Sequence, residues 1–383
     1  MLRKPTVAPL LLSGLLGTAS AADVHTILHP DEAHPIDQTV IWSPLFQAGW
    51  DALNRPLGGP PQRIDPPNPL MTRLDTFSWQ ADSVMPDGSW NVWAGPATNA
   101  LVNQANEQAS KLGAPAGCFT LGAESPHALA SFGYLNHTVR FDPHLYPSKK
   151  HGMQFRSPGK TKNVAFFGVR GPLTDRFSKT ISVLSWLPDS QTMTIDLAGK
   201  SAGNSAAYHV ILHATGKPAT IATASRTVKS LLETPAIDAT GDEHFGDALQ
   251  HLHPTDDLRI PFITLEANAS CEQRLQGGRI HGHPGDPWRI VKAQQLTTFM
   301  LDEKGARIAI RTASEFEPFG DKPPIRTFPK PRKFHFDRPF FVFLWKQGAD
   351  WPFFAAWLGD DSCMRPFHTG NIRSQPPAHP PAG

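Results

Sequence analysis

The chain has 383 residues, of which 40% are hydrophobic, and its formal net charge at pH 7 is only +2. This length and apolar content allow a sizeable core, in one large domain or two modest ones. A charge near zero without a basic patch argues against a nucleic-acid-binding protein. Three cysteines without close spacing provide no disulfide framework.

The first 21 residues have the pattern of a secretory signal. Arg3 and Lys4 precede an apolar run around Leu10–Leu16, and Ala19-Ser20-Ala21 provides a small-residue cleavage site. We therefore expect residues 1–21 to be removed and the protein to be secreted, extracellular or periplasmic. Pro5 and Pro9, before the run, make the signal less regular, so an uncleaved leader is the alternative. No later apolar run is long enough to predict a membrane anchor.

Helices are predicted at several points of the chain. Ser43 and Pro44 have the residue types of an N-cap and a first-turn proline. Ala97–Leu112, followed by a glycine stop, predicts the best early helix. Shorter helices are expected over Ser225–Leu232 and Phe245–Leu252. A proline-rich loop is predicted over Leu57–Pro69.

A strand, a reversal and a second strand are predicted near residue 300. Val291–Met300 is rich in apolar and β-branched residues and is followed by a polar turn that ends at Gly305. Side chains beyond this glycine alternate between two faces of an extended chain. One face carries Ala306, Ile308, Ile310 and Thr312, and the other Arg307, Ala309, Arg311 and Ala313.

A proline-rich segment follows, from Ser314 to Lys333. Its proline density is incompatible with a central strand or a helix interior. The strand-competent segment therefore leads into an exposed loop. Prolines also dominate Pro366–Gly383, for which we expect a disordered tail.

Motifs occur in order along most of the chain, in Gln38–Asn54, Ser131–Gly168, Asp257–Leu275 and Phe336–Asp360, with the segment Leu301–Thr312 before the last. Within Ser131–Gly168 they are Phe141-Asp142-Pro143, Phe155 and Gly159-Lys160-Thr161. Taken in this order, the segments resemble the serpins, inhibitors that trap proteases by inserting a cleaved loop into a sheet, and Leu301–Thr312 resembles their hinge segment.

This resemblance implies an α+β fold in one domain, residues 22–365, with three β-sheets, surrounding helices and an exposed reactive loop at about 303–333. It also implies a shutter, the region that lets the main sheet open. The matching residues are Ser43, Pro44, Ser131 and Gln295, the last standing where the family has a histidine.

The hinge implied by the resemblance consists of Glu303, Gly305, Ala306, Ile308, Ile310 and Thr312. Inhibitory serpins have small residues here, whereas Ile308 and Ile310 are bulky. Burying an isoleucine contributes about 1.5–3 kcal/mol, and overpacking costs about 1–3 kcal/mol. Because these effects nearly cancel, insertion is allowed but slowed.

The resemblance leaves the reactive bond open. Counting forward from the hinge places it at Phe319-Gly320, which suits a chymotrypsin-like enzyme. Counting backward places it near Phe328-Pro329, where proline would resist cleavage. Arg326-Thr327, between the two, would suit a trypsin-like enzyme. We prefer Phe319-Gly320.

The sequence thus predicts a monomeric, secreted inhibitor of serine endopeptidases, or of cysteine endopeptidases, that is not an enzyme. The alternative is a non-inhibitory serpin-fold binding or scaffolding protein. The expected partner is the target endopeptidase, with no nucleic acid or membrane. No cofactor or metal is expected, because the histidine pairs lack further ligands at persuasive spacing.

Overall fold

The computed structural model describes residues 24–55, 59, 63–198, 200–201, 204–205, 207–217, 219–275, 279–281, 288–308 and 329–368. Within these ranges the chain is a mixture of helices and strands, as the sequence predicts. The strands form three larger sheets and three two-stranded ribbons across the described residues. The signal segment 1–21 lies outside the described residues, as does most of the proline-rich tail.

The main sheet is built around one long strand, β20 (Arg289–Asp302). This strand confirms the element predicted over Val291–Met300 and extends it at both ends. Its neighbours are parallel β5 and antiparallel β18 and β21. The sheet order is β4-β5-β20-β21-β6 with β18 on the other edge of β20. The bounds are β4 (Trp90–Ala97), β5 (Ser125–Leu135), β6 (His137–Arg140), β18 (Ile263–Ser270) and β21 (Gly305–Ile308).

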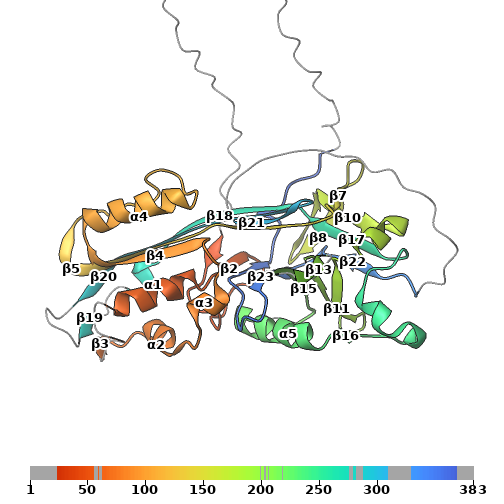
Figure 1. Cartoon of the computed structure of the whole chain (residues 1–383), viewed down its shortest axis with the longest axis horizontal. Coiled ribbons are helices and arrows are strands. Elements are labelled where there is room, and N and C mark those ends of the chain that lie inside the picture. The colour runs from red at the N-terminus through yellow and green to blue at the C-terminus, as the bar shows by residue number, and fades with distance from the viewer. Residues whose placement is uncertain are drawn as a thin grey trace, which may run out of the picture.

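Helices lie on both faces of the main sheet (Figure 1). On one face, α4 (Asn99–Lys111) begins after Thr98, whose side chain accepts the Leu101 N–H, and confirms the helix predicted there. Its alanines pack in one cluster with the sheet residues Trp93 and Phe132. On the opposite face, α1 (Leu45–Asn54) packs against β5 and β4. The central strands are therefore covered on both sides.

The start of α1 differs from the sequence prediction. Pro44, not Ser43, is the N-cap residue, and the helix begins at Leu45. The Ser43 hydroxyl accepts the Leu45 N–H at 3.2 Å and donates to the Phe353 carbonyl at 2.9 Å. Ser43 was misassigned because the sequence could not show the second contact, which ties the helix entrance to another sheet.

The second sheet is the most apolar part of the molecule. Its strand β23 reads FFVFLWK and is buried along nearly its whole length, as expected for a strand covered on both faces. The order is β1 (His25–Thr26), β2 (Thr39–Trp42), β24 (Phe354–Leu358), β23 (Phe340–Lys346), β15 (Tyr208–Ala214), β12 (Thr192–Asp196), β11 (Ser182–Leu187) and β16 (Ala236–Ile237). It packs against the main sheet, and the Phe299 and Phe354 rings stack at 4.7 Å.

The third sheet receives the chain as it returns after the proline-rich loop. Its order is β22 (Lys333–His335), β17 (Asp257–Pro261), β10 (Phe166–Arg170) and β7 (Tyr146–Pro147). The ribbons are β8 (Met153–Ser157) with β9 (Lys160–Val164), β13 (Lys200–Ser201) with β14 (Asn204–Ser205), and β3 (Arg63–Asp65) with β19 (Arg279–His281). β3 lies inside the segment predicted as a loop, because its pairing partner is distant in sequence.

The remaining helices are short except for α5. They are α2 (Pro69–Thr76), α3 (Ala81–Val84), α5 (Ile221–Glu233), α6 (Glu272–Leu275) and the 3₁₀ segments η1 (Gly171–Phe177) and η2 (Glu243–Gln250). α5 contains the helix predicted over Ser225–Leu232, whereas the one predicted over Phe245–Leu252 is 3₁₀ and interrupted at Gly246.

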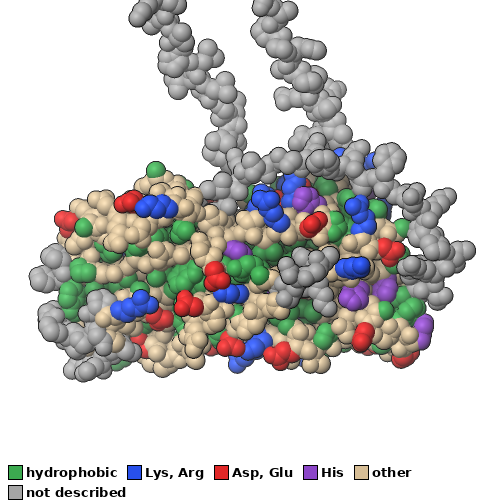
Figure 2. Space-filling model, in the orientation of Figure 1, with side chains coloured by type: hydrophobic (Ala, Val, Ile, Leu, Met, Phe, Trp, Pro, Cys, Tyr) green, Lys and Arg blue, Asp and Glu red, His purple; other side chains and the backbone are tan. Residues whose placement is uncertain are grey.

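The described helices include none long and apolar enough for a membrane span. The face in Figure 2 shows basic and acidic side chains intermixed, with no extended field of one sign. This agrees with the small net charge of the sequence.

Candidate functional site

The main sheet has a forked centre. In the lower half, which we call the closed half, β5 and β20 pair directly, from Ala128 with Arg289 to Tyr134 with Leu296. In the upper half, the open half, β5 is followed by β6, and β21 lies between β6 and β20 and pairs with each. The first four residues after the turn at Glu303 are thus already a strand of the sheet.

The open half has the same register as the closed half from Lys292, opposite Ala130, to Leu296, opposite Tyr134. A β-bulge between Ile290 and Lys292 shifts the register by one residue at the lower end. Gly305 in the open half joins Arg140 to Asp302, and Gly133 in the closed half faces Gln295. The residue numbers on the two strands differ by 162 in both cases, 302 minus 140 and 295 minus 133. A strand extending β21 downward would therefore need β5 and β20 to separate sideways, without sliding.

The β20–β21 turn is fixed by backbone contacts. The carbonyls of Glu303 and Lys304 accept the N–H groups of Leu145 and Phe141, each at 2.9 Å. Gly305 follows with φ of 152°, a conformation that favours glycine. A Cβ at this position would lie 2.2 Å from the Val139 carbonyl oxygen. Glycine is required here because the β6 backbone is too close for any side chain.

The faces of β21 agree with the predicted alternation. Ala306 and Ile308 are both fully buried. Arg307 points to the other face, where it forms an ion pair with Asp302. The Ile308 side chain thus occupies the sheet interior before any cleavage of the loop.

His137 lies at the fork, directly opposite Ile308. Its ring contacts the Tyr208 and Phe353 rings at centroid distances of 4.2 and 5.4 Å. Nδ1 lies 3.1 Å from the Ser89 hydroxyl, while Nε2 is buried and has no hydrogen-bond partner among the described residues. Burial lowers the pKa of His137 to about 4, so the ring is neutral at pH 7.

The predicted shutter residues Ser131 and Gln295 lie in the closed half. Both line a space of about 10 Å³ between the sheet and the start of α1. The Gln295 Nε2 donates to the Thr297 hydroxyl at 3.0 Å, whereas its Oε1 is buried and unpaired among the described residues. α1 lies very close, since a Cβ on Gly133 would meet the Leu45 Cγ at 2.9 Å.

The far end of the loop is anchored by a buried ion pair. Arg332, 5% exposed, donates to both carboxylate oxygens of Asp256, which is 1% exposed. Its remaining N–H groups donate to the Leu249 and His251 carbonyls at 2.6 Å each. The anchor holds the chain where it joins β22, which pairs with β17.

The structure brings together part of the predicted site. Glu303, Gly305, Ala306 and Ile308 form the turn and strand beside β20, and Ser131 and Gln295 lie below them. Ile310, Thr312, Phe319, Gly320, Arg326 and Thr327 lie outside the described residues. The described residues include no cluster of three or more His, Cys, Asp or Glu with metal-binding geometry.

Sequence reasoning missed His137 and the Arg332–Asp256 pair. Neither has a local motif, and Arg332 and Asp256 are 76 residues apart. An arginine in a proline-rich, basic stretch is expected on the surface, so the sequence did not predict that Arg332 is buried. Only the approach of two distant segments reveals its role.

The sequence matches no family model and no curated protein. Solved structures do match. Human glycosylated kallistatin is 12% identical over 85% of this chain and 92% of that chain, with a TM-score of 0.49. A thyroxine-binding globulin complex with thyroxine is 11% identical over 85% and 93%, at 0.48. The Manduca sexta serine protease inhibitor serpin-12 is 12% identical over 88% and 95%, at 0.47.

The chain is similar in structure to serpins. At TM-scores below 0.5 this similarity does not decide what the chain does. Function therefore has to be argued from the geometry of the forked sheet.

Proposed function

We propose that this chain is a secreted, monomeric serpin-like inhibitor of serine endopeptidases, with cysteine endopeptidases as a further target class. The observation that supports this most directly is β21, a strand already held between β6 and β20. The loop that follows it would be the bait. After cleavage, β21 would grow into a full strand of the main sheet.

The register of β21 defines where each inserted residue would lie. If it continued along β20 after insertion, Ile310 would lie opposite Thr297 and Thr312 opposite Gln295, beside the unpaired Oε1. Further on, Pro318 would lie opposite Arg289, the first residue of β20. Insertion over the whole of β20 would thus use the chain up to residue 318.

This length favours the bond Phe319-Gly320. Cleavage there would release a strand from Gly305 to Phe319, one residue longer than the 14 residues of β20. Cleavage at Arg326-Thr327 would leave seven further residues beyond the lower end of the sheet, with the protease held farther from it. We therefore retain Phe319-Gly320 as the proposed reactive bond and Arg326-Thr327 as the alternative.

The proposed reaction stops at an acyl-enzyme. The protease nucleophile attacks the carbonyl of Phe319, the peptide bond breaks, and the new amino group leaves on Gly320. The inserting strand then carries the ester-linked protease away from the loop. Insertion replaces the parallel β5–β20 pairing with two antiparallel ladders, so the cleaved form gains hydrogen bonds and buried surface.

A covalent complex tests the proposal. The mature chain is incubated with chymotrypsin, trypsin and papain, and complexes that survive denaturing gels are identified by mass spectrometry. We expect one with chymotrypsin, with the bond at Phe319. Phe319→Pro should abolish it, while Arg326→Ala, the matched change at the alternative bond, should not. Cleavage without any complex across the panel would exclude inhibition.

The tight closed half favours a second candidate, a non-inhibitory binding or scaffolding protein of the same fold. α1 leaves little room above Gly133, and Ile308 already fills the open half. In that case the loop would be cut without insertion. Loop cleavage would then leave the melting temperature unchanged, whereas insertion should raise it.

A further inference from the structure

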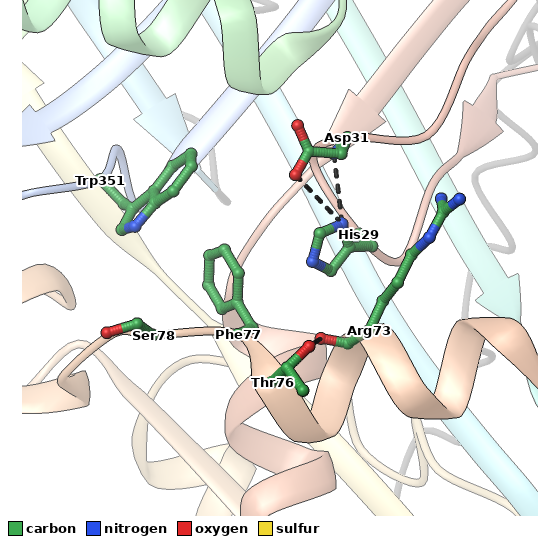
Figure 3. A pocket seen from close by; sticks show the side chains of 7 residues that line it. All are labelled: His29, Asp31, Arg73, Thr76, Phe77, Ser78 and Trp351. Carbon is green, nitrogen blue, oxygen red and sulfur yellow. Dashed lines mark hydrogen bonds and ion pairs between the residues drawn. The ribbon is translucent and has the colours of Figure 1, made fainter.

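A cavity of about 450 Å³ lies away from the forked sheet, where three separate parts of the chain meet. His29 and Asp31 come from the turn after β1. Arg73, Thr76, Phe77 and Ser78 come from the end of α2 and the residues after it. Trp351 comes from the connection between β23 and β24 (Figure 3). This volume suits a small organic ligand.

His29 is held in one orientation by its own turn. The Glu32 carboxylate accepts the backbone N–H groups of Leu28 and His29, both at 2.7 Å. The His29 Nδ1 accepts the Asp31 backbone N–H at 3.3 Å, so the neutral ring carries its proton on Nε2. The residue is only 6% exposed.

The lining carries one acidic and one basic side chain, which differ in their partners. Asp31 lies 3.5 Å from the Arg226 guanidinium through Oδ1 and 3.9 Å from the His29 Nδ1 through Oδ2. Arg73, in contrast, makes no ion pair within the described ranges. Burial lowers the pKa of His29; the Asp31 carboxylate acts against this effect, and Arg73 adds a smaller lowering. The His29 N–H and the Arg73 cation both favour an acceptor with negative charge.

The lining beside His29 is aromatic. The His29 and Phe77 rings meet edge to face at a centroid distance of 5.2 Å. The Phe77 and Trp351 rings lie 5.0 Å apart, and both are partly exposed. Trp42, 1% exposed, supports them from behind at 6.2 and 6.0 Å. Partly exposed rings held rigidly by a buried third ring provide a surface for a flat apolar group.

We propose that this cavity binds a small aromatic carboxylate. The carboxylate accepts the His29 Nε2–H and pairs with Arg73, and the aromatic body packs on Phe77 and Trp351. This binding is independent of protease inhibition, because the lining includes no residue of β21, β20 or the loop.

The test uses 2-naphthoate as the probe and isothermal titration calorimetry on the mature chain at pH 7.5. We expect one site per chain, and at least tenfold weaker binding of 2-naphthylmethanol, which lacks the charge. Arg73→Gln and His29→Phe should each weaken 2-naphthoate binding at least tenfold. Trp351→Ala should weaken both ligands.

Arg170→Gln is the matched control, an exposed arginine on β10 far from the cavity in sequence and sheet. It should leave the dissociation constant within about twofold. Arg73 is exposed, so its replacement should not unfold the chain, and an unchanged melting temperature checks this. Absence of binding, equal affinity for the alcohol, or an unaltered Arg73→Gln variant would each overturn the proposal.

Discussion

The two halves of the main sheet differ in whether a strand lies between their central strands: β21 does so in the upper half, and no strand does so in the described part of the lower half. In the upper half β21 separates β6 from β20 and buries Ala306 and Ile308. In the lower half β5 and β20 are in direct contact under the start of α1. Because the register is the same on both sides of the fork, down to the β-bulge between Ile290 and Lys292, the difference there is one of lateral separation. His137, opposite Ile308 at the end of β21, lies at the point below which β20 is no longer separated from the neighbouring strand.

The largest effect should come from truncating the side chain that holds the upper half open. Ile308→Ala removes a fully buried side chain and should lower the free energy of unfolding by about 2–5 kcal/mol. Ile310→Ala, two residues on, is the matched control and should change it by less than about 0.5 kcal/mol in the uncleaved chain. Urea denaturation measures both. Equal losses would mean that the inserted strand extends past Ile308.

Gly305→Ala should be nearly as damaging. The new Cβ would collide with the Val139 carbonyl, and the backbone conformation strains any other residue, at a cost of about 1–3 kcal/mol. We expect β21 to leave the sheet, with faster amide hydrogen exchange in β6. Gly88→Ala has a positive φ but an unobstructed Cβ, so it should reproduce only the backbone strain. If the β6 amides of Gly305→Ala kept their protection from hydrogen exchange, β21 would still be paired with β6, which would contradict this prediction.

Gly133→Ala probes the closed half. Its Cβ would press on Leu45, at a cost of about 1–3 kcal/mol for overpacking. In a cleaved chain the same methyl group would also lie beside the inserted Thr312. The gain in melting temperature on cleavage should therefore shrink in this variant. A full gain would show that α1 moves away when the sheet opens.

The smallest effect concerns pH. Burial lowers the pKa of His137 to about 4 from 6.5, so the unfolded chain binds the proton more readily. The stability due to the neutral ring is fully present above pH 6.5 and is lost as the pH falls toward 4. His137→Phe should make the decline in melting temperature over this interval less steep. Part of the decline should remain, because burial also lowers the pKa of His213 to about 4. His151→Gln, a control at an exposed position, should leave the slope of melting temperature against pH unchanged. An unaltered slope in His137→Phe would contradict the assignment of this pH dependence to His137.

Parts of this architecture could be predicted because their signal is local. The polar turn before Gly305 predicts a reversal, and the alternation after it predicts which side chains face inward. Ala306, Arg307 and Ile308 lie as predicted. The helix α4 and the glycine stop after it were likewise predictable from one segment, although the N-cap at Thr98 was not predicted. The start of α1 was misjudged because Ser43 also bonds to Phe353, more than 300 residues away.

By itself the sequence determined that a strand follows the turn, that its two faces differ, and that a proline-rich segment comes next. Backbone sterics and side-chain alternation act over a few residues, so one segment suffices to show them. Tertiary structure decided that β21 lies between β6 and β20 and that the register continues across the fork as far as Lys292. It also decided the burial of His137, the pairing of Arg332 with Asp256, and the formation of the cavity lined by His29. Each of these depends on segments distant in sequence, whose approach is fixed by packing of the whole chain.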